Sequence, residues 1–193
     1  DSITALAVWP ERGWAVSGSG DGSLTVWDLE RGQELRTVTG HADPVKAVAL
    51  WPERGWAVSA SVDGTLKVWD LERGQQVLTL AGHTSMVNAV ALWPERGWAV
   101  SASDDGTLKV WDLKRELGRG SGHNDRVTAV VPWPERGRVV SASGDGALKV
   151  WDLARGQEVS TLSGHQEKIT ALALWRERGR ARSGAGGGGL EGR

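Results

Sequence analysis

Serine, histidine and aspartate recur together along the chain at a fixed spacing. Ser59 follows His41 by 18 residues, Asp63 follows four residues later, and Trp69 six residues after that. The same spacing returns in two further sets: His83, Ser101, Asp105, Trp111 and His123, Ser141, Asp145, Trp151. Serine hydrolases use these three polar residue types, with histidine taking a proton from the nucleophilic serine. Hydrolysis is therefore the first hypothesis that the residues raise.

The number of copies argues against a hydrolase. An active site needs one polarised constellation beside a substrate cleft, whereas this chain repeats the set in each of three units. No nucleophile-elbow pattern surrounds the serines. All four histidines stand in Gly-His pairs, so none is left for metal binding or acid–base work. We therefore predict a protein that is not an enzyme and that holds no cofactor or metal.

A repeat of 40 to 42 residues generates this spacing, and propeller repeats have a period of this length. Its two marks are Trp-Asp, at residues 27–28, 69–70, 111–112 and 151–152, and Gly-His, at residues 40–41, 82–83, 122–123 and 164–165. Within residues 41–81, four short apolar or alternating runs predict strands at 45–50, 56–61, 65–69 and 76–80. Asp63 and Gly64 predict a tight hairpin between the second and third strands.

The combination of Gly-His with Ser-Ala-Ser-x-Asp-Gly-Thr-Leu-Lys-Val-Trp-Asp, repeated in register, resembles the WD40 repeat. The resemblance covers residues 1–175 and implies an all-β fold of β-propeller blades with four antiparallel strands each. It also implies a hydrogen-bond chain inside each blade, from tryptophan to serine, from serine to histidine, and from histidine to the aspartate of the turn. Buried polar groups must be paired, and a fully paired network fixes the strand register. Ser17, Asp21 and Trp27 fit this network in the first unit, but no Gly-His precedes them.

The repeat predicts four blades and a degenerate fifth half-blade. We place the blades at residues 1–39, 40–81, 82–121 and 122–163, and the first strand of the fifth at 164–175. The outer strand of the third blade is two residues short and contains Gly118 and Gly120, which weaken a strand. In the fifth unit the repeat requires Asp at 187 and Trp at 193, where the sequence has Gly187 and Arg193. We expect residues 176–193 to be a Gly- and Arg-rich tail that is disordered from about residue 180.

Composition narrows the classes of partner. With 23 basic and 24 acidic residues, the chain has no large field that would attract nucleic acid or an acidic membrane. No apolar run approaches the length of a membrane span and no signal-peptide pattern opens the chain, so we expect a cytoplasmic protein. The arginines at 176, 178, 180 and 182 admit an RNA-binding interpretation, but an eroded, solvated strand explains them more simply.

Two rims of the expected propeller are candidates for recognition. On the Gly-His rim the copies differ, which indicates either specificity for a partner or drift in exposed loops. The candidate partner-binding residues on this rim are Asp43, Val62, Met86, Asp104, Asp125 and Arg126. On the opposite rim, tryptophans bracket the Pro-Glu-Arg-Gly turns and form either a binding girdle or packing between blades. The candidates there are Trp51, Trp56, Trp93 and Trp98.

Three functions remain open at this stage. The first is a protein-interaction scaffold, the second is an eroded repeat array without a selected partner, and the third is a ligand- or sugar-binding propeller. A common seven-bladed ring needs about 290 residues at this period, and an open fan exposes the apolar sides of its end blades. We favour a scaffold that binds proteins or peptides and that associates with a second copy to close an eight-bladed ring.

Overall fold

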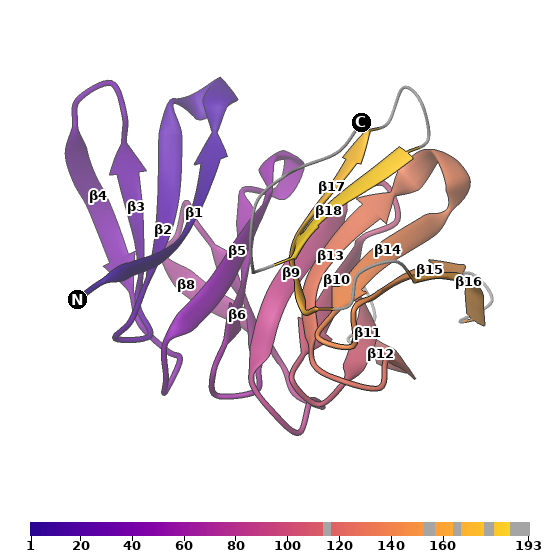
Figure 1. The fold of residues 1–193 in the computed structure, drawn as a ribbon. Coiled ribbons are helices and arrows are strands. Elements are labelled where there is room, and N and C mark those ends of the chain that lie inside the picture. The colour runs from indigo at the N-terminus through magenta and orange to yellow at the C-terminus, as the bar shows by residue number, and fades with distance from the viewer. Residues whose placement is uncertain (114–116, 153–156, 164–166, 176–179, 186–193) are drawn as a thin grey trace.

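Five antiparallel sheets make up the fold, and they stand side by side along the chain like the blades of an open fan (Figure 1). The computed structural model describes residues 1–113, 117–152, 157–163, 167–175 and 180–185. Four of the sheets have four strands and the last has two, which confirms the expected all-β propeller architecture of four blades and a fifth half-blade. No helix among the described residues is long and apolar enough to cross a membrane.

Each complete blade is a meander whose strands follow one another from the inside of the fan outward. Blade 1 has β1 (Ile3–Trp9), β2 (Trp14–Ser19), β3 (Leu24–Asp28) and β4 (Gln33–Val38). Blade 2 has β5 (Val45–Trp51), β6 (Trp56–Ser61), β7 (Leu66–Asp70) and β8 (Gln75–Leu80). Blade 3 has β9 (Val87–Trp93), β10 (Trp98–Ser103), β11 (Thr107–Asp112) and β12 (Leu117–Gly122). Blade 4 has β13 (Val127–Trp133), β14 (Arg138–Ser143), β15 (Ala147–Asp152) and β16 (Gln157–Ser163).

Two kinds of turn connect the inner strands, and each needs a glycine. Three of the four Pro-Glu-Arg segments form single 3-10 turns, η1 (Pro10–Arg12), η2 (Pro52–Arg54) and η3 (Pro134–Arg136), and the segment at 94–96 forms a turn of another kind. Gly55, which ends η2, has φ +67°, a left-handed conformation that costs a glycine little. Gly64 of the Asp-Gly hairpin has φ +80° for the same reason. The 3-10 turns lie at the upper rim in Figure 1 and the Asp-Gly hairpins at the lower rim.

The apolar core is divided into clusters that lie between neighbouring blades. Each blade has a leading face, which contacts the blade before it, and a trailing face, which contacts the blade after it. At the junction of blades 1 and 2, the leading-face residues Val45, Trp69 and Leu71 share one cluster with the trailing-face residues Trp9 and Val38. Equivalent clusters fill the next two junctions. A blade therefore reaches its full burial only when it has a neighbour on both faces.

A two-stranded half-blade follows blade 4. β17 (Ile169–Trp175) pairs with β18 (Arg180–Ala185), although we expected disorder from about residue 180. Ile169 and Leu172 pack on the trailing face of blade 4, which supports a pair that has no third strand among the described residues. Residues 176–179 and 186–193 of the expected tail lie outside the described residues. β12 also forms and pairs along β11 despite Gly118 and Gly120.

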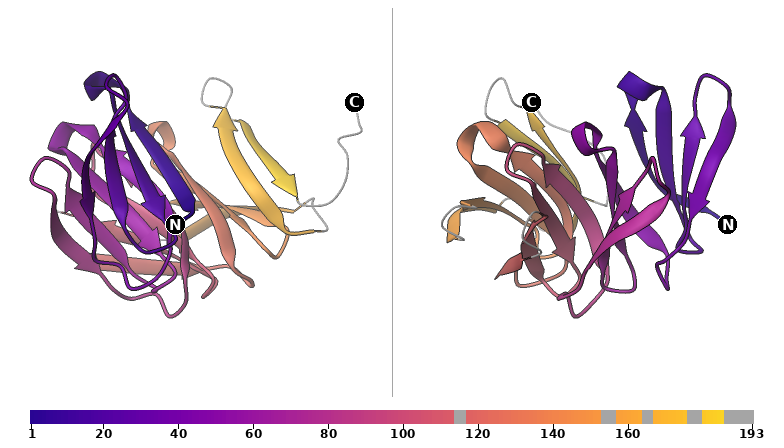
Figure 2. Two further views of the ribbon diagram at one scale, coloured as in Figure 1. Left: turned by 90° about the vertical axis from the view of Figure 1, so that its left-hand side faces the viewer. Right: turned by 180° about the vertical axis from the view of Figure 1, so that it is seen from behind.

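The fan does not close on itself. Figure 2 shows blade 1, in indigo, and the β17–β18 half-blade, in yellow, at opposite ends of the arrangement. Within the part of the chain that the structure describes, blade 1 therefore has no neighbour on its leading face, whereas blades 2, 3 and 4 each have one.

The contact between Trp69 and Gly40 provides a test of junction packing. A Cβ atom on Gly40 would lie 2.9 Å from Trp69 Cη2, closer than real Cβ atoms approach. We expect Gly40→Ala to lower the free energy of unfolding by about 1–3 kcal/mol in urea denaturation, because the core is overpacked. In a Trp69→Phe background the same substitution should cost less, because the smaller ring leaves room for the methyl group. Equal costs in both backgrounds would contradict this junction geometry.

Candidate functional site

The three Ser-His-Asp-Trp sets lie inside blades, and blade 2 shows their geometry. Trp69 on β7 donates its indole N–H to Ser59 Oγ on β6 at 2.8 Å. His41 lies with Nε2 2.7 Å from Ser59 Oγ and Nδ1 2.8 Å from Asp63 Oδ2. The chain of hydrogen bonds thus begins at the third strand, passes through the second strand, and reaches His41 in the loop before the first strand. It ends at Asp63 in the β6–β7 hairpin.

Blades 3 and 4 repeat this geometry closely. In blade 3 the corresponding distances are 2.8 Å from Trp111 to Ser101, 2.7 Å from Ser101 to His83, and 2.7 Å from His83 to Asp105. In blade 4 they are 2.8 Å from Trp151 to Ser141, 2.6 Å from Ser141 to His123, and 3.2 Å from His123 to Asp145. The structure therefore brings together all twelve residues that the sequence grouped in these three blades.

One proton arrangement satisfies every atom of the network in blade 2. Ser59 Oγ accepts the indole N–H of Trp69, so its own proton is free to go to His41 Nε2. The proton of the imidazole ring then sits on Nδ1 and is donated to Asp63, and the histidine is neutral. Burial lowers the pKa of His41, and the carboxylate of Asp63 opposes this shift without reversing it. The pKa values of His83 and His123 are lowered for the same reason.

Asp63 connects the network to the turn. Burial raises the pKa of this carboxyl group, but hydrogen bonds from Thr65 and His41 outweigh burial and hold the pKa below its ordinary value. Oδ1 accepts the backbone N–H and the hydroxyl of Thr65, at 2.9 and 2.7 Å. Oδ2 also accepts the backbone N–H of Ala42 at 3.1 Å. The carboxylate therefore fixes both the hairpin and the loop after the histidine.

Sequence reasoning missed two members of this turn. Ser61, the second serine of Ser-Ala-Ser, donates its hydroxyl to the backbone oxygen of Asp43 at 2.9 Å and accepts the N–H of Asp63 at 3.2 Å. Thr65 supports Asp63 as described above, and Thr107 supports Asp105 in the same way. Serine and threonine recur at these two positions, at a fixed distance from the aspartate. This recurrence could have identified them as members of the turn.

Blade 1 holds a shortened network. Trp27 donates to Ser17 at 2.8 Å as in the other blades, but no histidine bridges Ser17 to the turn. Asp21 is exposed and accepts the backbone N–H of Ser23 at 2.9 Å. Hydrogen bonds from Ser23 lower the pKa of Asp21. Trp27 is also only half-buried, whereas Trp69 is 1% exposed.

The geometry leaves this serine and histidine chemistry without access to a substrate. Ser59, Ser101 and Ser141 are completely buried, and so is the side chain of His41. A nucleophile must reach a reacting carbon atom, and these hydroxyl groups face only the interior of their own blades. Among the described residues, no group of His, Asp and Glu side chains is arranged to hold a metal ion.

The tryptophans of the opposite rim pack in pairs around the Pro-Glu-Arg-Gly turns. Trp51 and Trp56 meet edge to face with ring centroids 6.0 Å apart, and the Arg54 guanidinium lies 5.0 and 4.9 Å from the two centroids. Trp93, Trp98 and Arg96 repeat this arrangement. The first tryptophan of each pair is 4% exposed and fills the junction with the next blade, so it offers almost no surface to a partner. The second is half-buried beneath the arginine.

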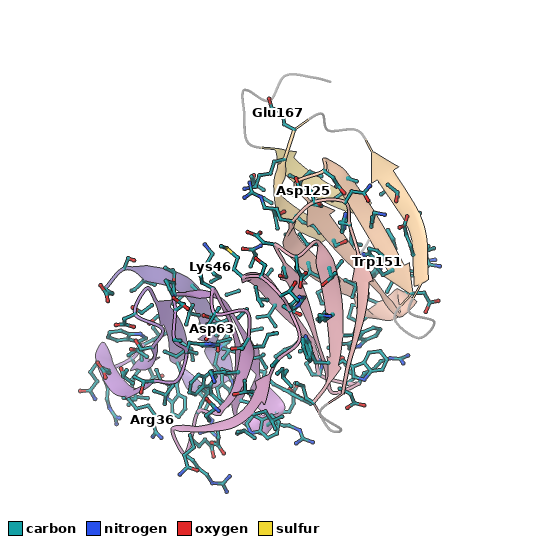
Figure 3. All side chains as sticks on the ribbon, turned by 90° about the horizontal axis from the view of Figure 1, so that it is seen from below. Arg36, Lys46, Asp63, Asp125, Trp151 and Glu167 are labelled. Carbon is teal, nitrogen blue, oxygen red and sulfur yellow. The ribbon has the colours of Figure 1, made fainter. Side chains whose placement is uncertain are left out.

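The candidate residues of the Gly-His rim are more accessible. Figure 3 views the molecule from this rim and labels Asp63 and Asp125. Asp43, Asp125 and Arg126 are exposed, whereas Val62, Met86 and Asp104 are half-buried. Asp104 accepts a hydrogen bond from the Asn88 amide at 2.6 Å, so part of its carboxylate is already engaged. The exposed three are therefore the strongest candidates for contact with a partner.

Removing the turn carboxylate should affect blade 2 more than blade 1. Asp63→Ala leaves the buried imidazole N–H of His41 with only the more distant Thr65 Oγ1, at 3.4 Å, as an acceptor, which we expect to cost about 1–3 kcal/mol of stability. Asp21→Ala is the matched control, because this carboxylate is exposed and contacts no histidine. Equal thermal shifts for Asp63→Ala and Asp21→Ala would show that the histidine link contributes nothing.

The tryptophan of the network contributes through packing. We expect Trp69→Ala to lower the stability by about 3–5 kcal/mol, because the substitution leaves a cavity, and thermal melts measure this loss.

The network also predicts how stability depends on pH. The ordinary histidine pKa of 6.5 is lowered in the folded blades, so below that pH the unfolded chain binds protons that the folded chain does not. The free energy of unfolding should therefore decrease as the pH falls from about 8 to 5. A further decrease is expected below 3.8, where unfolded Asp63 and Asp145 take up protons. Urea denaturation at several pH values measures this, and greater stability at pH 5 than at pH 8 would mean that the buried histidines are charged.

Comparison with known families agrees with the geometry. The family described as WD domain, G-beta repeat matches residues 1–28, 32–70, 74–112 and 114–152. No curated protein sequence matches the chain. Each match from the second onward begins at the outer strand of one blade, or just before it, and ends at the Trp-Asp of the next blade, so a sequence repeat spans a junction. The matches together cover more than half of the residues, and the chain belongs to the WD domain, G-beta repeat family.

Proposed function

We propose that this chain is a non-catalytic scaffold for protein–protein interaction, and that its leading face on blade 1 binds a second copy of the chain. WD repeats generally mediate protein–protein interaction. The observation that best supports this proposal is that the leading face of blade 1 is apolar and exposed. Ile3, Leu6, Val8 and Leu29 on blade 1 are between 50% and 66% exposed.

The equivalent residues of the later blades indicate what this face is suited to bind. Val45, Val87, Val127 and Ile169 occupy the position of Ile3, and each is 0% exposed. Leu71 occupies the position of Leu29 and is 1% exposed. In each of these cases the covering surface is the trailing face of the blade before it. The natural occupant of the blade 1 face is therefore another trailing face.

A trailing face of this kind is exposed at the other end of the chain. Ala171 on β17 takes the position of Ala5, which packs against blade 2, but Ala171 is exposed. Because β17 already covers part of blade 4, an incoming blade 1 would meet the half-blade. A two-chain ring built in this way contains two half-blades in addition to the eight complete blades. Head-to-tail contacts of this type close into a ring when the rotation permits.

Charge favours the same head-to-tail pairing. Residues 1–39 carry six acidic and three basic side chains, whereas residues 167–193 carry three acidic and six basic side chains. Within the chain, Arg12 of blade 1 forms an ion pair with Glu72 of blade 2 across their junction. Glu30 is the blade 1 equivalent of Glu72, and it lies against Gly13 as Glu72 lies against Gly55. It is therefore placed to accept an arginine from the tail of a second copy.

The strength of the contact between two copies depends on how much apolar surface it buries. The four apolar side chains are 50% to 66% exposed, so burying what remains exposed is worth about 3–7 kcal/mol, and the apolar surface covered on the second copy adds to this. Association costs about 4–15 kcal/mol in lost translational and rotational freedom, so the contact is of moderate strength and depends on protein concentration. The Gly-His rim would remain open in such a ring, and we propose Asp43, Asp125 and Arg126 there as the contacts for a further protein or peptide.

Light scattering after size exclusion tests the self-association. We expect the wild-type mass to rise toward twice the monomer mass of 20.6 kDa as the protein concentration increases. The double variant Leu6→Lys, Val8→Lys should stay at the monomer mass, because it places two charges on the leading face of blade 1.

Val77→Lys serves as the matched control. Val77 is an apolar residue that is 41% exposed on the outer strand of blade 2, away from the proposed contact. Its substitution should leave the concentration-dependent increase in mass intact. A wild-type chain that remains at 20.6 kDa at every concentration, with blade 1 folded, contradicts binding of a second copy.

A further inference from the structure

The half-blade has two strands in the part of the chain that the structure describes, and the outer edge of β18 has no partner there. β17 and β18 pair in the register of the complete blades, with Leu172 opposite Ser183 as Val48 is opposite Ser59. In each complete blade the second strand also pairs with a third, but among the described residues β18 pairs only with β17. The backbone N–H and C=O groups along such an edge are a template for another strand.

The blade beside this edge is also missing part of its cover. Val38 and Leu80 end the outer strands of blades 1 and 2, and they are 8% and 4% exposed. Trp69 and Trp111, on the third strands of the following blades, share their clusters. Leu162 has the same position in blade 4 but is 51% exposed. The repeat places the covering tryptophan of the fifth unit at residue 193, where the sequence has arginine.

We propose that the β18 edge and the Leu162 surface together form an acceptor site for a β-hairpin supplied by another polypeptide. The first strand of this hairpin would pair with β18, and its tryptophan would cover Leu162. The second strand would complete the outer edge of the fifth blade. The site is distinct from the leading face of blade 1, which lies at the other end of the fan (Figure 2).

The register specifies two residues of the incoming strand. Ser183 occupies the position of Ser59, which accepts the indole N–H of Trp69, so a tryptophan is expected in the incoming strand. Arg180 occupies the position of Arg138, which lies opposite Asp152 in blade 4. In the register of blade 4, a residue directly after the tryptophan would pair with position 180, where the sequence has arginine, so an acidic residue is expected there. The acceptor site therefore selects strands that end in Trp-Asp or Trp-Glu.

A peptide from the chain itself is a suitable probe. Residues 62–81 include the third and fourth strands of blade 2, and a fluorescent peptide of this sequence carries the required Trp-Asp pair. Its binding is measured by anisotropy with the full chain carrying Leu6→Lys and Val8→Lys, which removes the proposed self-association. We expect saturable binding at one peptide per chain. Binding should weaken about tenfold or more with Leu162→Lys in the protein, or with Trp69→Ala in the peptide.

Val77→Lys again provides the matched control, because it adds the same charge to an outer strand that already has its neighbour. It should leave the peptide affinity unchanged. Absence of saturable binding, or equal loss of affinity with Leu162→Lys and Val77→Lys, would overturn the acceptor site. Because peptide binding is measured on a chain that does not self-associate, this proposal and the binding of a second copy can fail separately.

Discussion

Burial of the leading face of each blade against the preceding blade is the interaction on which the rest of the structure depends. A single four-stranded sheet buries little apolar surface alone, and here the apolar clusters lie between sheets. Two tryptophans are the largest side chains in each of these contacts, one from the end of the first strand of the preceding blade and one from the third strand of the following blade. Trp69 fits over Gly40, which lies two residues after the end of β4 and has no side chain in the way. This contact makes the blades interdependent and leaves the first of them with an uncovered face.

The polar network holds that tryptophan in place. Its indole N–H is bonded to a buried serine, and the serine is bonded through histidine to the aspartate of the hairpin. A strand shifted by one residue would turn the tryptophan to the opposite face and leave the serine unpaired. From the second match onward, each family repeat runs from an outer strand to the Trp-Asp of the next blade, so one repeat contains both the Gly-His and the tryptophan that packs behind it. The repeat thus encodes a junction as well as a sheet.

Much of this architecture follows from the sequence, because the period and the offsets recur in register. The strands, the turns and the grouping of His41, Ser59, Asp63 and Trp69 were all predictable in this way. The pairing of β18 with β17 was not predictable. It accompanies the packing of Ile169 and Leu172 on blade 4, which the glycine-rich composition does not indicate. The burial of Trp51 and Trp93 in the junctions was not decided either, since Trp is common both in cores and at binding surfaces. Exposure at Leu6 and Leu162 became evident only when equivalent positions were compared in three dimensions.

The two ends of the fan differ in chemistry, and we propose a different partner for each. Blade 1 presents a complete apolar face, whereas the half-blade presents a strand edge beside Leu162. The central claim is that the blade 1 face is a docking surface, and carbene footprinting at low and high protein concentration tests it directly. The account predicts that labelling of Ile3, Leu6 and Val8 decreases as the concentration rises while labelling of Val77 stays constant. Labelling of blade 1 that is independent of concentration would contradict it.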